Sequence, residues 1–315
     1  MNDMEQTMQN NSGKLELIRQ GIAQGNQHVE LIIHNYLSSF IDSLKDFRID
    51  WQKINNNTVT DIMCPSIEQI NGKKEEFVQM LEIIVTSKSL CTGEVFTSFF
   101  ERLLQFYQDN DITLYTSKEP HILANDNYRY LNQSLFISFA AVMIENQRFD
   151  VLAEVVNSRF LITNSNRLGG LDDVNFIRFR EYNYTLNEFL NEKTMSNAYS
   201  YTAFTMKTLS NRLDFRKMVD ADILLYYLSL LYPGDDFFDR FWCPETAAFN
   251  HKAQILPKLV SKKYFNKAKV LFGVDTVEEF KEKIANISQA ANQYHAYGAP
   301  DIMTGLCVSQ VGTIS

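Results

Sequence analysis

The chain has 315 residues, of which 45% are hydrophobic and 22% charged, and this balance excludes a globally disordered protein. The formal net charge of −8 argues against a protein that coats nucleic acid over its whole surface, although a local basic patch can still bind an anion. Only 12 glycines and 6 prolines are present, too few for the many tight turns of a β-sandwich or barrel. The composition therefore favours a helical globular protein.

The cysteines and the N-terminal residues bear on the cellular compartment of the protein. The cysteines lie far apart and form no C-x-x-C motif, as expected for free thiols in a reducing environment: Cys64, Cys91, Cys243 and Cys307. The first dozen residues are polar and lack the apolar core of a secretory signal. We therefore expect a cytoplasmic protein, and the frequent Asn, Ile and Lys are typical of an AT-rich bacterial gene. Stress response, phage defence and plasmid biology stay open as its setting.

The N-terminal part of the chain predicts a long amphipathic helix. Residues 1–13 are expected to form a flexible tail, after which apolar residues at helical spacing predict a helix from Lys14 to about Arg48. Gly21 and Gly25 predict a bend or break near its start.

Two further helices precede the middle of the chain. Apolar stripes predict them over residues 73–87 and 94–107. Ser66 and Gln69 have the spacing of a capping box, but Gly72 interrupts the pattern, so the helix is placed after it. The stretch 109–127 is rich in Asn and Asp and is predicted to be a loop.

The most apolar segment of the chain is 131–156. Its first fourteen residues carry no charge, but a bilayer span needs about 20 apolar residues, and Asn132 and Gln133 interrupt this one. We therefore predict a core helix and no membrane association. A turn near Phe149 and a second short helix over 151–158 would complete a helical hairpin.

The second half mixes irregular segments with helices that carry start signals. Residues 163–184 contain Gly-Gly and have irregular apolar spacing. Thr185 and Glu188 form a capping box for a helix over 186–195, and Thr276 and Glu279 form another for the last helix. Asp220 is the expected N-cap of a helix that Pro233 ends.

Together these elements predict a mainly α protein. We expect an irregular multi-helix globular bundle of about ten helices around a central hydrophobic helical hairpin (131–158), with at most a minor β element. The expected organisation is a single domain over 14–298, with an N-terminal helical subdomain over 14–110 as an alternative division. A C-terminal tail over 299–315, with one charged side chain, would follow.

No catalytic, cofactor or metal motif stands out. The phosphate-binding, dinucleotide-binding, kinase and HExxH motifs are absent, and the five histidines are scattered, so we predict no cofactor and no metal site. Cys243 lies near Arg240, yet a buried small side chain is the simpler interpretation. Glu279 and Lys281 have the E-x-K spacing of some nucleases, but Glu279 is better explained as a helix cap. Asp222 is interpreted as a first-turn residue beside the positive end of a helix.

Arginine is concentrated in the middle of the chain, with nine of 12 arginines between residues 129 and 240. Within this window arginine and tyrosine alternate, and in an extended segment they would share one face suited to a phosphate and a stacked base. The anion-binding candidates are Arg159, Arg167, Arg178, Arg180, Tyr182 and Tyr184. The alternative is a structural network in which the arginines pair with Glu181, Asp172 or Asp173.

A run without acidic residues extends from Thr246 to Val274. It forms a candidate basic patch of six lysines: Lys252, Lys258, Lys262, Lys263, Lys267 and Lys269. Such a patch can receive nucleic acid or an acidic partner, and two aromatic residues within "SKKYFNKAK" would suit a nucleic-acid backbone. The alternative is a solvated helix face.

Three functions follow from these observations. The first is a non-catalytic, cytoplasmic, α-helical interaction or regulatory protein that acts through a protein partner or as a homo-oligomer. The second is a nucleic-acid or nucleotide-binding protein that uses the Arg/Tyr segment (178–184) and the lysine run (252–269). The third is a metal-dependent nuclease with dispersed carboxylates. The first is preferred because no catalytic set is visible, although a dispersed active site leaves no motif.

Overall fold

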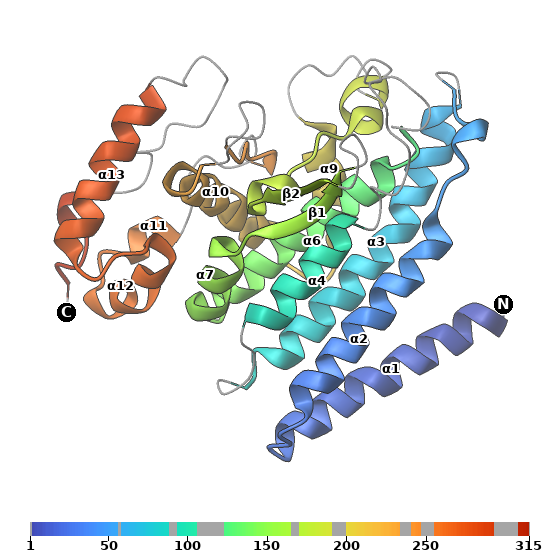
Figure 1. Cartoon of the computed structure of the whole chain (residues 1–315), viewed down its shortest axis with the longest axis horizontal. Helices are drawn as coiled ribbons and strands as arrows, with labels where there is room; N and C mark the ends of the chain where they lie inside the picture. The colour runs from blue at the N-terminus through green and yellow to red at the C-terminus, as the bar shows by residue number, and fades with distance from the viewer. Residues whose placement is uncertain are drawn as a thin grey trace.

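The protein is mainly helical with one small antiparallel sheet (Figure 1). The computed structural model describes residues 2–55, 58–87, 93–105, 123–164, 170–190, 200–233, 241–246, 255–292 and 308–314. Buried apolar side chains form one cluster that extends from Leu15 to Val311. The expectation of a mainly α fold with a minor β element is therefore confirmed.

Two helices form the N-terminal hairpin, α1 (Asn2–Ala23) and α2 (Val29–Ser43). The predicted break lies between them, where Gly25 has a φ of +62°, a conformation that glycine adopts without strain. Short 3-10 helices follow at η1 (Leu44–Phe47) and η2 (Trp51–Lys53). The helix starts earlier than expected, since α1 already includes residues 2–13.

The next two helices are α3 (Val59–Ile84) and α4 (Gly93–Gln105). The prediction that a helix begins only at residue 73 was wrong, because α3 runs through Pro65 and Gly72. The turns before residue 73 bury a stripe of apolar side chains at helical spacing, formed by Val59, Met63, Ile67 and Ile70. This burial offsets the backbone hydrogen bond that is lost at Pro65, which has no N–H. Positions 109–122 of the predicted loop (109–127) lie outside the described residues.

The central hairpin consists of α6 (Asp126–Glu145) and α7 (Phe149–Asn157). Every side chain of α6 from Tyr130 to Met143 is buried, because α3, α7, α10 (Phe215–Leu231) and the phenylalanines of α4 pack around it (Figure 1). A helix that is covered on all sides needs no polar face, and this explains the uncharged stretch of sequence. The predicted hydrophobic hairpin is confirmed.

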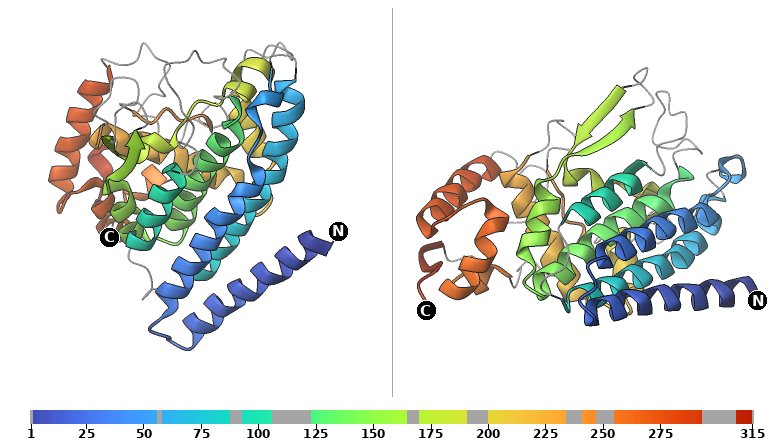
Figure 2. Two further views of the ribbon diagram at one scale, coloured as in Figure 1. Left: turned by 45° about the vertical axis from the view of Figure 1, so that its right-hand side comes forward. Right: turned by 60° about the horizontal axis from the view of Figure 1, so that its bottom comes forward.

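An antiparallel β-hairpin follows α7. It pairs β1 (Phe160–Asn164) with β2 (Gly170–Val174), with Phe160 opposite Val174 and Asn164 opposite Gly170. The hairpin projects from the helical body, as the right-hand view of Figure 2 shows. Its base is anchored because Phe160 is fully buried, with its ring centroid 5.1 Å from that of Phe179.

Short helices connect the hairpin to α10: η3 (Phe176–Phe179), the π-helix η4 (Thr185–Leu190) and α9 (Tyr201–Thr208). Two predicted helix starts here were wrong. Asn183, rather than Thr185, accepts the N–H of Leu186 at the start of η4. Asp214 caps α10, which places Asp220 inside that helix.

The C-terminal part contains α11 (Ile255–Lys258), α12 (Lys262–Ala268), η6 (Lys269–Phe272), α13 (Val277–Asn292) and η8 (Val308–Gln310). The capping box of α13 is confirmed, since the Glu279 N–H donates to Thr276 Oγ1 (3.2 Å) and the Thr276 N–H to Glu279 Oε2 (3.4 Å). Within the predicted tail, Ile314 forms a parallel β-bridge with Ser261.

Phe136 on α6 provides a test of the core. Its ring stacks on Phe179 with centroids 4.5 Å apart and lies 5.0 Å from Phe100. We expect Phe136→Ala to lower the free energy of unfolding by about 3–5 kcal/mol, because the cavity and the lost transfer energy add. Urea denaturation followed by circular dichroism would measure it. The exposed control Leu31→Ala should stay within about 0.5 kcal/mol of the wild type, and equal losses would contradict the central place of Phe136.

Candidate functional site

The Arg/Tyr segment does not form the extended strand that the sequence analysis considered. Asn175 accepts the N–H of Ile177 and starts η3, which includes Arg178 and buries Phe176 and Phe179. Arg178 and Arg180 therefore cannot share a face with the tyrosines through strand alternation. The segment lies instead between α6 and the chain at 241–246, and both sides bind it through polar contacts.

The arginines in this region contact acidic groups of the same chain. Arg159 pairs with Asp173 (Nε–Oδ1 2.9 Å) on the β-hairpin. Arg178 lies 3.7 Å from Glu181, and Arg180 lies 3.5 Å from Glu245 and donates to the carbonyl of Cys243. Arg167 lies outside the described residues. The described arginines of the prediction thus take part in ion pairs, which is the arrangement of a structural network.

Asp126 on α6 holds one side of the segment. Its Oδ2 accepts the backbone N–H of Thr185 at 2.6 Å, and its Oδ1 accepts from Arg129 at 2.7 Å. Asn183 donates to the Asp126 carbonyl, and Arg129 also reaches Glu181 at 3.3 Å. Burial raises the pKa of Asp126, and the Arg129 charge and the Thr185 N–H partly oppose this rise. The carboxyl group therefore ties the start of η4 to the first turn of α6.

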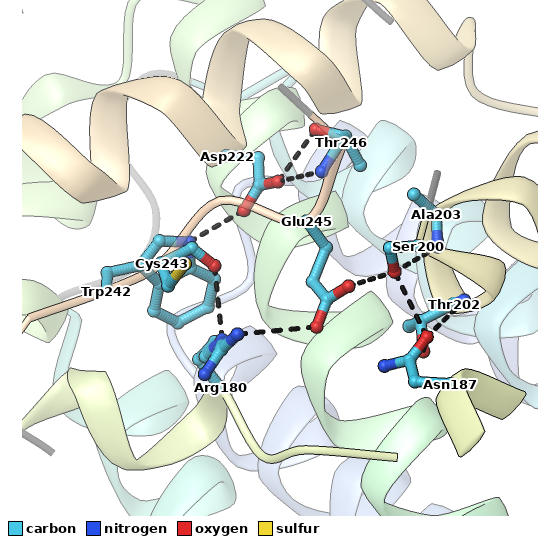
Figure 3. A network of polar contacts seen from close by, with 10 residues as sticks. All are labelled: Arg180, Asn187, Ser200, Thr202, Ala203, Asp222, Trp242, Cys243, Glu245 and Thr246. Carbon is cyan, nitrogen blue, oxygen red and sulfur yellow. Dashed lines mark hydrogen bonds and ion pairs between the residues drawn. The ribbon is translucent and has the colours of Figure 1, made fainter. Parts of the chain in front are cut away.

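Asp222 on α10 holds the chain at 242–246, which lies on the other side of the Arg/Tyr segment (Figure 3). It is fully buried and accepts from Trp242 Nε1 (2.6 Å), the Thr246 N–H (2.8 Å) and Thr246 Oγ1 (2.7 Å). Burial raises the pKa of Asp222 to about 6, although these three donors favour the charged form. Trp242 is drawn into the aromatic core, where it lies 5.9 Å from Phe136. One carboxyl group thus fixes the path of residues 242–246.

Glu245 links this path to the Arg/Tyr segment and to α9. Figure 3 shows its carboxylate between Arg180 and Ser200, with a hydrogen bond from the Ser200 hydroxyl. Ser200 also caps α9 by accepting the Ala203 N–H. The side chain of Asn187 on η4 accepts from the Thr202 N–H at 3.2 Å. Four segments of the chain therefore meet in one network.

An aromatic rim borders the network. The rings of Tyr182 and Tyr184 lie edge to face with centroids 5.0 Å apart, and the Arg129 guanidinium lies 5.6 Å from the Tyr184 ring. Tyr182 is 38% exposed. Burial, with Glu188 and Glu245 nearby, raises the pKa of Tyr182. The tyrosine rings therefore lie beside arginine and glutamate side chains that already form ion pairs with one another.

The chemical capacity of this arrangement is limited. Although Cys243 reaches solvent, desolvation raises the pKa of its thiol, and nearby Arg180 only partly opposes the rise. A raised pKa disfavours the nucleophilic thiolate. Arg240, which the sequence placed beside this cysteine, lies outside the described residues. The carboxyl groups of Asp126 and Asp222 are occupied by internal donors, so the network favours positioning of chain segments over proton transfer.

The lysine run lies apart from this network. Lys258 ends α11, Lys262, Lys263 and Lys267 belong to α12, and Lys269 begins η6. Lys267 donates to Gln147 Oε1 (2.7 Å) and Lys269 to the carbonyl of Asp275 (2.9 Å). Lys252 is outside the described residues. The two groups of predicted residues thus do not form one site.

The sequence did not predict the residues that organise the network. The prediction that Asp222 lies in the first turn of a helix is wrong, because α10 begins at residue 215 and buries Asp222 in its middle. The available signal was a single acidic residue within the apolar run "ADILLYYLSLL". An acidic side chain on an otherwise apolar helix must be hydrogen-bonded when buried. The signal predicts donors but does not identify Trp242 and Thr246.

Asp222 predicts a pH dependence of stability. Its pKa is raised from 3.8 in the unfolded chain to about 6 in the folded protein, so the protonated form favours folding. This stabilisation is complete below about pH 4 and disappears as the pH rises through about 6, a change of about 3 kcal/mol. Asp222→Asn cannot titrate and leaves one donor unmatched, at a pH-independent cost of about 1–3 kcal/mol.

We therefore expect the wild type to lose stability relative to Asp222→Asn between pH 4 and pH 7. Urea unfolding of both proteins across this range measures the difference, and Leu31→Ala provides a control that should follow the wild-type profile. A constant difference between wild type and Asp222→Asn would contradict the raised pKa.

Comparisons with known proteins do not assign a family. No protein-family model, no curated protein and no solved structure matches this chain. No helix among the described residues combines the length and apolar character needed to cross a bilayer. Within the same described residues, no group of three or more His, Cys, Asp or Glu side chains is placed to hold a metal ion.

Proposed function

We propose that this protein is non-catalytic and acts by binding a protein partner through its β-hairpin. The observation that carries the proposal is a pair of exposed leucines on one face of the hairpin, Leu161 (46% exposed) and Leu171 (61% exposed). The register places Leu161 opposite Asp173, so Leu171 is its diagonal neighbour. Together they give this projecting element an apolar surface that a protein partner can cover.

The two edges of the hairpin differ, and this difference supports strand addition by the partner. The N–H of Leu161 donates to Glu101 Oε2, and its carbonyl accepts from Gln105, both at 2.8 Å, so α4 covers the edge of β1. Because the backbone groups of successive residues point to opposite sides of a strand, those of Leu171 and Asp173 point to the outer edge of β2. Among the described residues, only Arg159 binds this edge, at the Asp173 carbonyl. A partner strand can pair there and cover Leu171.

The internal networks favour this function over the alternatives. Arg178 and Arg180 pair with Glu181 and Glu245, which reduces their capacity for phosphate. Nucleic-acid binding by the Arg/Tyr segment is for this reason the less favoured proposal. The outer edge of β2 offers the backbone groups of Leu171, which no described residue binds, together with apolar surface, and both are properties of a protein-binding edge.

Photo-crosslinking tests the proposal. A photo-reactive amino acid at Thr163, which is exposed opposite Leu171, should give one adduct with a different protein in the cell that produces this chain. Leu161→Thr/Leu171→Thr should reduce that adduct about tenfold, because the apolar anchors are lost. The matched control Leu17→Gln/Leu31→Gln removes two exposed leucines from α1 and α2 and should leave the adduct unchanged.

Two results would contradict the proposed function. An adduct with the mass of two copies of this chain would show self-association at the hairpin edge. An adduct that persists in the hairpin double variant would show that the leucines are not part of the contact. Unfolding curves of both double variants must match the wild type, so that loss of the adduct reports the surface and not the fold.

A further inference from the structure

A second surface, separate from the hairpin, lies on the C-terminal helices. We define the basic face as the exposed residues Lys258, Lys262, Lys263, Lys267, Val270 and Ile314. We propose that the basic face binds an acidic segment of a protein partner that also carries apolar side chains. This inference goes beyond the proposed function, because it concerns another surface and specifies the chemistry of what binds there.

The C-terminal helices that carry the basic face contain more lysines than acidic residues. Residues 255–292 contain seven lysines and four acidic residues, in a chain whose net charge is −8. The acidic residues near the α6–α7 turn pair elsewhere, Glu145 with Lys217 and Asp150 with Arg148. Within the described part of the chain, no acidic side chain forms an ion pair with the four lysines of the face. Such a local excess attracts an anionic partner.

Two exposed apolar side chains lie within the basic face. Lys263, Lys267 and Val270 follow one another at helical spacing along α12 and η6, and Val270 is 43% exposed. Ile314 is 61% exposed, and its backbone is fixed beside α12 because its carbonyl accepts the Lys262 N–H at 2.7 Å. The lysines would pair with carboxylates of the partner, while Val270 and Ile314 would contact its apolar side chains.

The aromatic residues of this region argue for a peptide over nucleic acid. Phe265 is fully buried against Phe280, with ring centroids 5.6 Å apart, and the Tyr264 ring packs edge to face on Phe149 at 5.5 Å. These are the two aromatics that the sequence suggested for contact with a nucleic acid. Since Phe265 is buried and the half-buried Tyr264 ring packs on Phe149, the basic face offers little ring surface on which a base can stack. It also contains lysine and no arginine, whose planar group suits phosphate better.

Fluorescence anisotropy with the purified full chain tests the proposal. The probe is a labelled short peptide that alternates glutamate and leucine, and the comparison probes are a glutamate–serine peptide, a single-stranded RNA and a DNA duplex. We expect the glutamate–leucine peptide to bind most tightly. Lys263→Glu/Lys267→Glu should weaken it about tenfold, because the reversed charges repel the carboxylates. Val270→Ser should weaken the glutamate–leucine peptide and leave the glutamate–serine peptide unchanged.

The matched control is Lys45→Glu/Lys53→Glu, which changes the net charge equally at two exposed lysines elsewhere in the chain. Its peptide affinity should stay within about twofold of the wild type. The hairpin variant Leu161→Thr/Leu171→Thr should bind the peptide normally, which separates this inference from the proposed function. Equal weakening by the control, no peptide binding at low salt, or tighter binding of RNA or DNA would each overturn the inference.

Discussion

The arrangement of the second half of the chain depends on the burial of two carboxyl groups, Asp126 and Asp222. A buried carboxylate is strongly unfavourable unless hydrogen-bond donors surround it. Here the donors come from segments without regular secondary structure or at its borders, such as the Thr185 N–H and the Trp242 and Thr246 groups. Because each carboxyl group lies on a core helix, satisfying it brings an irregular segment to a defined place on that helix.

This constraint explains why irregular chain can lie beside the most apolar helix of the protein. The segment that follows the β-hairpin inserts Phe176 and Phe179 into the core and is then tied to α6 through Asn183 and Thr185. The chain at 242–246 inserts Trp242 next to the same aromatic rings and is tied to α10. Aromatic packing supplies the apolar contact, and the carboxyl groups determine the register of each segment.

The sequence predicted the helices whose apolar stripes repeat over several turns, but it did not predict which local signals would start them. Ser66/Gln69, Thr185/Glu188 and Thr276/Glu279 have the same capping spacing, and only the last pair caps a helix. Ser66 lies inside α3, where the stripe continues upstream, and the Thr185 N–H is bound by Asp126. Local spacing is the same in the three cases, and contacts with residues distant in the sequence decide the outcome.

The candidate site was less predictable than the fold for a related physical reason. Composition and spacing revealed which side chains are unusual, such as the arginine-rich window and the lysine run. They could not show that Glu181 and Glu245 would lie beside Arg178 and Arg180, because this requires the fold. Among the described residues, the lysines of the basic face form no comparable ion pair with an acidic side chain. The same kind of sequence signal therefore marks an internal network in one place and an open surface in the other.

A buried carboxyl group that holds a chain segment in place lowers the stability of the fold when it is ionised. With a pKa near 6, Asp222 is mostly ionised at neutral pH and destabilises the fold relative to its protonated form. What the carboxyl group supplies is a defined geometry, since its three donors fit only one path of residues 242–246. The β-hairpin precedes the Arg/Tyr segment, which Arg180 links to this path through Glu245. The base of the hairpin is fixed by Phe160 in the core and by α4 at Leu161. In the proposed complex, a strand edge that is already in place would lose less conformational entropy on pairing than the same sequence in a flexible loop, and this would favour tighter binding.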